Sequence, residues 1–431
     1  MSKSLKQPNR LKEGGRIDRS RKLSFTFNGQ RYQGHAGDTL ASALLANGVD
    51  IVNRSFKYSR PRGIVAAGAE EPNAWIQLGS TEAAQVPNVR ATQQALFDGL
   101  VARSTNGWPN VQHDLMGWVG KVGGRFMPPG FYYKTFMAPA SMWMTYEKYI
   151  RKSAGLGRSP MERDPDSYDH LNQHCDLLVI GAGPAGLAAA LTAARSGARV
   201  ILADEQEEMG GSLLDSRELV DNQPAAQWAE RVLKELAGLD NVTLLARTTA
   251  NGYHDHHFVT LHERRTEHLG ETAPLVSGHR PSRSRMHRVR AGQVLLATGA
   301  HERPLVYGNN DLPGNLLAGA VSTYIRRYGV VPGHKLVLST RNDYAYRAAL
   351  DWIDAGREVV AIVDARPAPN GEWVEQARAR GIRIIEGAAV LEAKGANRVN
   401  GARVATIDAG AFKVTGQAET LDCDTIASSG G

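Results

Sequence analysis

Three glycines carry the clearest chemical signal of the sequence: Gly181, Gly183 and Gly186. They stand between the apolar run Leu177–Ile180 and an apolar segment with helical character. In this pattern, the first glycine permits a tight turn, the second lets the backbone approach a pyrophosphate, and the third lets helix and strand pack closely. The N-terminus of the helix, with Ala185 in its first turn, would present amides and its positive dipole end to the phosphates. The loop therefore predicts a dinucleotide site.

An acidic residue stands at the expected distance from this loop. The apolar run Val200–Ala203 ends at Asp204, 18 residues beyond Gly186, and Glu205 follows. A carboxylate here can accept hydrogen bonds from the adenosine ribose hydroxyls, and Glu205 could share that role. The negative charge would also repel the 2′-phosphate of NADP. The acids therefore favour NAD or FAD without deciding between them.

Three segments further along the chain add candidate positions. Met209-Gly-Gly is followed by Ser212, whose hydroxyl could reach a phosphate, and Ala250 ends a strand where a backbone group commonly meets an adenine ring. Thr298 and Gly299 end an apolar strand of the kind that closes such a site. Each position alone could be an ordinary strand end. Their order along the chain makes them candidates for cofactor binding.

Residues 335–364 predict a second strand–helix–strand unit. Its turn carries Thr340, Arg341 and Asn342 where a phosphate loop needs glycines, and these side chains would obstruct a pyrophosphate. We therefore expect that this unit binds no dinucleotide in the usual mode. No acid, base or nucleophile set can be given a catalytic role in either unit.

The elements that would position the glycine loop are those of an α/β fold. Residues 171–431 predict a Rossmann-type domain of the two-dinucleotide-fold kind, with a second βαβ unit inserted into the first. Expected strands lie near 177–180, 199–203, 242–246 and 294–297, and a helix over 186–195. Residues 424–431 are expected to form a strand that returns to the first sheet and to leave this domain incomplete.

Residues 1–100 predict a tail and a small α+β module that resembles a β-grasp ferredoxin. Two strands flank an Asn28-Gly29 turn, and Asp38-Thr39 begins a helix over residues 40–47. The cysteine spacing of plant-type ferredoxins falls on Ala66, Glu71 and Ala74. Cysteine occurs only at positions 175 and 423, so we predict no iron–sulfur cluster, and we expect the acidic pair at 70–71 to be a solvated loop.

Residues 101–170 form a connecting segment rich in aromatic residues, Pro and Gly. Large apolar groups are rare in flexible linkers. We therefore expect this segment to bury its rings on the next domain or on a partner chain, with Arg125–Tyr146 as the docking surface.

The net charge of +7 is concentrated in two short clusters: eight Lys or Arg within residues 1–22, and Arg280, Arg283, Arg285, Arg288 and Arg290. Neither has interleaved aromatic residues, so we expect a solvated tail and a charged hairpin arm and no nucleic-acid partner. The longest apolar run, 177–194, is broken by Gly and Pro, and the N-terminus lacks a secretion signal. These features, with two distant cysteines, indicate a soluble cytoplasmic protein without membrane contact.

Two histidine-containing stretches could form sites. His254-Asp-His256-His257 favours a polar hairpin turn over a metal site, because adjacent residues point in different directions. No metal is expected. His301-Glu302-Arg303 could line a cavity or form a local ion pair, and both remain open.

Several phrases of the sequence together resemble the alpha subunit of heterotetrameric sarcosine oxidase, over nearly the whole chain. They lie at 37–48, 54–63, 68–73, 130–137, 181–186, 204–206 and 297–304. The resemblance carries over Gly181, Gly183, Ala185, Gly186, Asp204, Glu205 and Ser212. It implies NAD at the glycine loop, partner beta, gamma and delta subunits, FAD on the beta subunit and FMN near the alpha–beta interface.

The family's enzyme oxidatively demethylates sarcosine to glycine, with hydrogen peroxide and formaldehyde, or 5,10-methylenetetrahydrofolate, as further products. The family's folate-binding domain would follow Gly431, so folate chemistry is not assigned to this chain, which looks like a fragment. Two alternatives stay open. One is the alpha subunit of a related opine, hydroxyproline or cyanide-forming dehydrogenase with FAD at the same loop, and the other is a non-catalytic scaffold that contains NAD.

Overall fold

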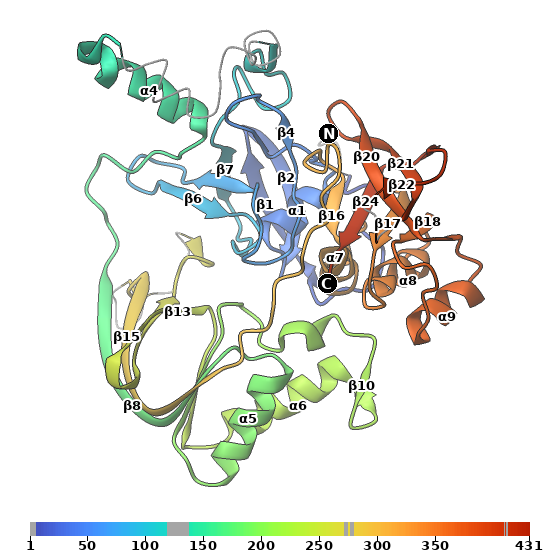
Figure 1. The fold of residues 1–431 in the computed structure, drawn as a ribbon. Coiled ribbons are helices and arrows are strands. Elements are labelled where there is room, and N and C mark those ends of the chain that lie inside the picture. Colours follow the sequence, from blue (N-terminus) through green and yellow to red (C-terminus); the bar gives the residue numbers. More distant parts are fainter. Residues whose placement is uncertain (1–5, 119–137, 271–274, 276–279, 409, 411–412) are drawn as a thin grey trace. The chain divides into compact units, whose positions relative to one another are not determined.

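The computed structural model describes residues 6–118, 138–270, 275, 280–408, 410 and 413–431. The chain forms two compact units (Figure 1): unit 1 combines Met1–Asp164 with Glu302–Gly431, and unit 2 spans Pro165–His301. This division differs from the three segments expected at 1–100, 101–170 and 171–431. The reason is that the second strand–helix–strand segment shares one hydrophobic core with the N-terminal module.

The N-terminal module of unit 1 is built on a five-stranded sheet of order β2-β1-β7-β5-β6. Its elements are β1 (Asp18–Phe27), β2 (Gln30–Ala36), α1 (Leu40–Ala46), β3 (Asn53–Arg54), β4 (Pro61–Arg62), β5 (Trp75–Leu78), β6 (Val86–Arg90) and β7 (Leu100–Ser104). The predicted hairpin is confirmed, because Phe27 pairs with Gln30 across Asn28-Gly29, whose φ angles are positive. The predicted helix is confirmed as well, with Thr39 as its N-cap.

The other part of unit 1 contains a parallel sheet of order β16-β24-β17-β18-β19. Its elements are β16 (Asn315–Leu317), α7 (Ala318–Tyr328), β17 (Lys335–Thr340), α8 (Tyr346–Asp354), β18 (Glu358–Asp364), α9 (Glu372–Ala379), β19 (Ile384–Glu386) and β24 (Thr425–Ser429), with antiparallel β20 (Ala388–Gly395), β21 (Val399–Asp408), β22 (Lys413–Val414) and β23 (Glu419–Leu421). The predicted second unit is confirmed as β17, α8 and β18. The expectation that residues 424–431 return to the first sheet is wrong. All five residues of β24 are buried, and the strand lies between β16 and β17.

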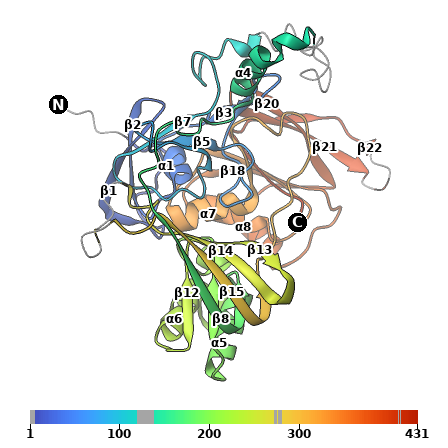
Figure 2. The same cartoon turned by 90° about the vertical axis from the view of Figure 1, so that its left-hand side faces the viewer.

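Unit 2 is built on a six-stranded sheet of order β12-β9-β8-β15-β14-β13. Its elements are β8 (Tyr168–Ile180), α5 (Pro184–Arg195), β9 (Val200–Ala203), the 3-10 turn η3 (Gly211–Leu214), β10 (Leu219–Val220), β11 (Gln223–Pro224), α6 (Ala225–Ala237), β12 (Val242–Leu245), β13 (Thr248–His254), η4 (Asp255–His257), β14 (Phe258–Arg264) and β15 (Ser284–Leu296). Strands β12, β9, β8 and β15 run parallel, as a dinucleotide fold requires. Figure 2 shows the long strands β8 and β15 side by side, and α5 and α6 pack their apolar residues against β8 and β9.

The connecting segment contains the 3-10 turn η2 (Ala140–Met142) and α4 (Trp143–Ala154). The twelve residues of α4 are all described and none of them is buried, with Met144 68% and Tyr149 70% exposed. Residues 125–137 of the expected docking surface, Arg125–Tyr146, lie outside the described residues, so their burial stays a prediction. No described helix is long and apolar enough to cross a membrane.

Candidate dinucleotide-binding site

The glycine loop joins β8 to α5, and backbone packing requires two of its glycines. Gly181 has a φ of +100°, which strains any side chain, and an added Cβ would lie 2.3 Å from the carbonyl oxygen of Ala297. An added Cβ on Gly186 would lie 1.8 Å from the carbonyl oxygen of Gly181. Both distances are far below van der Waals contact. These two glycines therefore set the turn and the close approach of α5 to the strands.

No packing or backbone constraint within the protein requires a glycine at position 183. Its φ of −76° suits any residue, and an added Cβ would meet no heavy atom of the protein within 4 Å. It is the N-cap of α5, where no described side chain forms a capping hydrogen bond, and Pro184 and Ala185 of the first turn are exposed. Such a helix end attracts anions through its amides and dipole. The start of α5 therefore leaves room beside Gly183 for an anionic group such as a phosphate.

Asp204 follows β9 and lies directly at the glycine loop. Its Oδ2 accepts a hydrogen bond from the backbone N–H of Ala182 at 2.7 Å, and its Oδ1 accepts one from the N–H of Gln206 at 2.8 Å. Each carboxylate oxygen retains a further acceptor position for a ribose hydroxyl. The side chain can therefore orient the loop and bind a ribose. Glu205, the second candidate acid, is half-buried beside it.

The Gly-Gly turn at the start of η3 contacts the glycine loop. Gly210 and Gly211 both have positive φ, and an added Cβ on Gly211 would lie 2.9 Å from the Cα of Gly183. This approach leaves no room for a side chain on Gly211, which packs against the glycine loop, whereas an added Cβ on Gly210 would meet the side chain of Leu214. Ser212 follows directly within η3 and is exposed.

The three remaining candidates also lie in unit 2. Ala250 belongs to β13, which starts next to the acid because the N–H of Thr248 donates to the carbonyl of Asp204 at 2.7 Å. Thr298 and Gly299 follow the end of β15, next to the turn at Gly181, and both are exposed. Ala250 lies inside β13, so the expectation that it ends a strand is wrong. The other sequence-predicted residues lie around the carboxyl ends of β8, β9 and β15.

Two arginines beside the acids were missed from the sequence. Arg264 of β14 donates to the carbonyl oxygen of Glu205 at 2.8 Å, and Arg247 donates its N–H to the carbonyl of Gln206 and pairs with Glu207. Both hold the segment that carries the acids. No local spacing could reveal Arg264, because β13 and β14 bring it back to the acids from 59 residues away.

Comparison with known proteins agrees with this geometry. The family model described as pyridine nucleotide-disulphide oxidoreductase matches residues 175–431. The chain belongs to this family. It is 48% identical over 423 residues to the sarcosine oxidase subunit alpha of Rhizobium meliloti (strain 1021), covering 98% of this chain and 41% of the relative. It is 38% identical to the same-named subunit of Corynebacterium sp. (strain U-96), covering 97% of this chain and 38% of the relative.

The chain therefore spans about two fifths of the length of these relatives. A crystal structure of L-proline dehydrogenase from P. horikoshii matches 99% of this chain and 62% of its own with a TM-score of 0.59 and 17% identity, which shows a likeness of fold alone. A family model described as 2Fe-2S iron-sulfur cluster binding domain matches residues 20–107. These matches confirm the predicted α/β fold with a ferredoxin-like module and the resemblance to sarcosine oxidase alpha subunits.

The second βαβ unit of this oxidoreductase fold has a turn filled by its own side chains. Thr340 accepts a hydrogen bond from the N–H of Asn342 at 3.1 Å, and the Asn342 amide donates to the Ser429 hydroxyl at 3.0 Å. At the end of β18, where a ribose-binding acid would stand, Asp364 is fully buried and accepts from Arg366 at 2.7 Å. These contacts support the prediction that the usual dinucleotide mode is blocked here.

The match to cluster-binding domains raises the question of whether this module can hold a cluster. The residues at the expected ligand positions are Ala66, Glu71 and Ala74, and alanine offers no ligand atom. Cys175, in β8, and Cys423, between β23 and β24, are both buried and lie far along the chain. The donor set therefore does not fit an iron–sulfur cluster. The expectation that the acidic pair forms a solvated loop is wrong for Glu71, which is 1% exposed.

Glu302 of the His301-Glu302-Arg303 stretch belongs to unit 1 and caps a helix. Its Oε2 accepts from the N–H of Gly319 in the first turn of α7 at 2.8 Å, and the helix dipole favours a carboxylate there. Burial raises the pKa of this carboxyl, against the hydrogen bonds from Ser429 and Gly319. The sequence left open whether this stretch lines a cavity or forms a local ion pair. Neither describes Glu302, whose carboxylate binds the N-terminus of α7.

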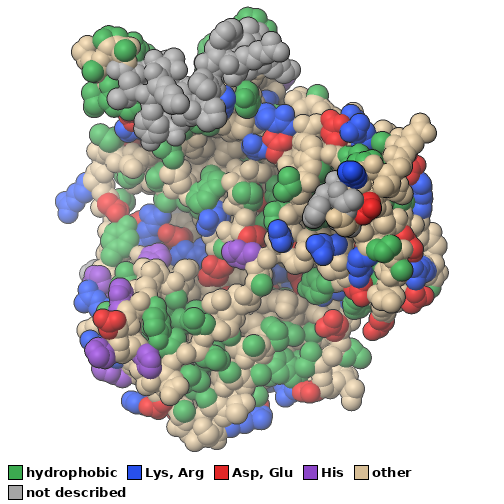
Figure 3. All heavy atoms as spheres, viewed as in Figure 1, with side chains coloured by type: hydrophobic (Ala, Val, Ile, Leu, Met, Phe, Trp, Pro, Cys, Tyr) green, Lys and Arg blue, Asp and Glu red, His purple; other side chains and the backbone are tan. Residues whose placement is uncertain are grey.

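The other charged stretches are explained locally. The expected polar turn at 254–257 is confirmed, because η4 joins β13 to β14. Histidines gather on this part of the surface in Figure 3, yet no group of three His, Cys, Asp or Glu side chains among the described residues could hold a metal ion. In the arginine cluster, Arg283 pairs with Asp166 at 3.0 Å and Arg285 with Asp169 at 2.9 Å. Local acids thus balance part of its charge.

Proposed function

We propose that this chain is the NAD-binding alpha subunit of a sarcosine oxidase-type complex. One observation supports dinucleotide binding above all: Gly183 leaves open space at the uncapped N-terminus of α5, where a phosphate can approach. The acid at position 204, beside the same loop, favours NAD or FAD over NADP. The resemblance to sarcosine oxidase alpha subunits supports NAD over FAD at this loop.

In the proposed site, each group has a separate task. The amides of Ala185 and Gly186 would bind the pyrophosphate, and Asp204, with Glu205 beside it, would bind the adenosine ribose. Ser212 would add a phosphate contact. Ala250 would contact the adenine ring, and Thr298 and Gly299 would line the dinucleotide site next to the glycine loop. A dinucleotide bound here supplies hydride chemistry, and the protein supplies its position.

The proposed reaction of the whole complex is the oxidative demethylation of sarcosine to glycine. Formaldehyde, or 5,10-methylenetetrahydrofolate, and hydrogen peroxide would be the other products. In this proposal the beta subunit carries FAD and the amine-oxidation site, FMN lies near the alpha–beta interface, and gamma and delta subunits complete a cytoplasmic heterotetramer. No residue of the present chain is assigned a catalytic role.

Identification of the bound cofactor tests this proposal most directly. The chain is purified alone and together with its beta, gamma and delta partners, denatured, and the released nucleotide is identified by absorbance and mass spectrometry. We expect NAD from the chain alone and NAD, FAD and FMN from the complex. Release of FAD from the chain alone would contradict the proposal and favour the related opine, hydroxyproline or cyanide-forming dehydrogenases.

A further inference from the structure

The buried carboxylate of Glu71 organises the loop of the ferredoxin-like module. Its Oε2 accepts from the backbone N–H groups of Val65 and Ala66 at 2.8 and 2.7 Å. Its Oε1 accepts from those of Asn73 and Ala74 at 2.7 and 3.0 Å. Two amides before the acid and two after it thus converge on one negatively charged group.

The arrangement matches the acceptor chemistry of a carboxylate. An ionised carboxyl only accepts hydrogen bonds and has about four acceptor positions, all of which are used here. Burial raises the pKa of the Glu71 carboxyl, and the four N–H donors oppose this rise because they favour the charged form. A proton on either oxygen would have to displace one of the donors. The geometry therefore suits an anion.

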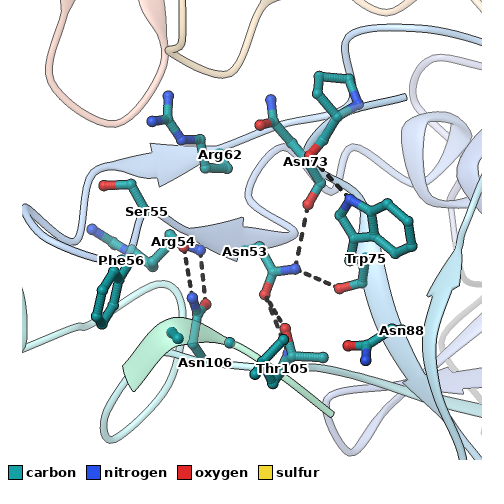
Figure 4. A pocket seen from close by; sticks show the side chains of 14 residues that line it. Asn53, Arg54, Ser55, Phe56, Arg62, Asn73, Trp75, Asn88, Thr105 and Asn106 are labelled. Atoms are coloured by element: carbon teal, nitrogen blue, oxygen red, sulfur yellow. Dashed lines mark hydrogen bonds between the residues drawn. The ribbon is translucent and has the colours of Figure 1, made fainter. Parts of the chain in front are cut away.

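The outgoing end of the same loop is held through its carbonyl groups (Figure 4). The Asn53 amide donates to the carbonyl oxygens of Asn73 and Trp75, and its oxygen accepts from the Thr105 N–H and hydroxyl. These side chains line a cavity of about 540 Å³, in which the polar groups of Asn53 are bonded to the loop and to Thr105. Glu71 and Asn53 thus fix the loop from its N–H side and its carbonyl side.

The organised loop is also where the module meets the α/β part of unit 1. The carbonyl of Val65 accepts from the N–H of Leu317 at 2.8 Å, and the carbonyl of Ala66 accepts from the hydroxyl of the buried Tyr324 at 2.7 Å. These carbonyls belong to the residues whose N–H groups bind Glu71. A carboxylate that orients Val65 and Ala66 therefore also orients the contacts to β16 and α7.

We propose that the Glu71 carboxylate replaces an iron–sulfur cluster as the anion that shapes this loop, and that the loop acts as the joint between the ferredoxin-like module and the α/β part of unit 1. Two consequences follow. The joint depends on one glutamate and not on a metal, and loss of the carboxylate must loosen α7 as well as the loop. This inference does not depend on the proposed function.

Amide hydrogen exchange of the purified chain tests the joint. In the wild type, we expect slow exchange at Val65, Ala66, Asn73, Ala74 and Leu317. Exchange at these five amides as fast as in the exposed turns would overturn the proposal without any variant. In parallel, anaerobic incubation with ferrous iron and sulfide should leave no bound cluster, and stoichiometric iron with acid-labile sulfide would refute it.

Two variants test whether the carboxylate of Glu71 itself is responsible for the slow exchange. Glu71→Gln puts an N–H₂ group against two N–H donors, so we expect exchange at the four loop amides and at Leu317 to rise at least about tenfold, since a hydrogen bond to a charged group is lost. Glu70→Gln is the matched control and should leave these rates unchanged. Equal rates in both variants would refute the role of Glu71. Should Glu71→Gln not fold, the wild-type exchange and iron measurements decide.

Discussion

Substitution of Gly183 by alanine should weaken ligand binding without disturbing the packing of the protein. The added methyl group meets no heavy atom of the protein within 4 Å, and the φ of −76° suits alanine. We therefore expect the melting temperature of the protein without cofactor to stay unchanged. The methyl group would instead project into the space at the start of α5 where the pyrophosphate is proposed to bind.

The expected loss of affinity follows from the contacts that would be displaced. Holding a pyrophosphate away from the first turn of α5 removes one charge-assisted hydrogen bond, which contributes about 1.5–3 kcal/mol. This free energy corresponds to a dissociation constant roughly 10- to 150-fold higher. The attraction to the helix dipole also weakens, because it acts mainly within the first turn.

Isothermal titration with NAD and the nucleotide content after purification measure this effect. Gly238→Ala is the matched control, since Gly238 is the C-cap of α6 in the same unit, has a φ of −86°, and an added Cβ would make contacts no closer than 3.4 Å. Gly186→Ala should instead lower the melting temperature, because its Cβ would overlap the Gly181 carbonyl. Unchanged NAD affinity in Gly183→Ala would refute the proposed phosphate position.

Three further outcomes are expected. Asp204→Ala should lower both NAD occupancy and the stability of unit 2, because its carboxylate also holds the N–H of Ala182; unchanged occupancy after purification would exclude it as the ribose ligand. Burial lowers the pKa of His268 from 6.5 to about 4, so the unfolded chain binds a proton at a higher pH than the folded protein does. The free energy of unfolding should therefore fall as the pH drops from about 6.5 to about 4. Chemical denaturation at several pH values should show a smaller fall in the free energy of unfolding for His268→Gln than for the wild type. The chain alone should not oxidise sarcosine, and peroxide release from sarcosine by the purified chain would contradict the assignment of flavin to a partner.

Local spacing was sufficient to predict the core of the candidate site. The three glycines, the strand before them and the acid 18 residues later lie close together because one strand–helix–strand unit contains them all. The Asn28-Gly29 hairpin and the Thr39 cap were predictable for the same reason. In each case, the physical constraint acts within a few residues or within one supersecondary unit.

Predictions that depended on long-range pairing were less successful. The apolar strand after position 424 fits either sheet by composition, and only the pairing of β24 with β16 and β17 decides between them. Likewise, two adjacent glutamates suggest a solvated loop. Four amides from both sides of the loop bury Glu71, and nothing in the spacing reveals their convergence.

The two βαβ units share a backbone fold but differ in the residues of the turn that follows the first strand. Both place a turn at the carboxyl end of a buried parallel strand, which is where α/β folds bind ligands. In unit 2, Gly183 leaves that turn open beside an uncapped helix. In unit 1, the Thr340 hydroxyl accepts from the N–H of Asn342, whose amide donates to Ser429, so these polar groups of the turn already have partners. A phosphate would have to displace these bonds, whereas beside Gly183 it would meet open space. This difference favours unit 2 as the place of the proposed dinucleotide.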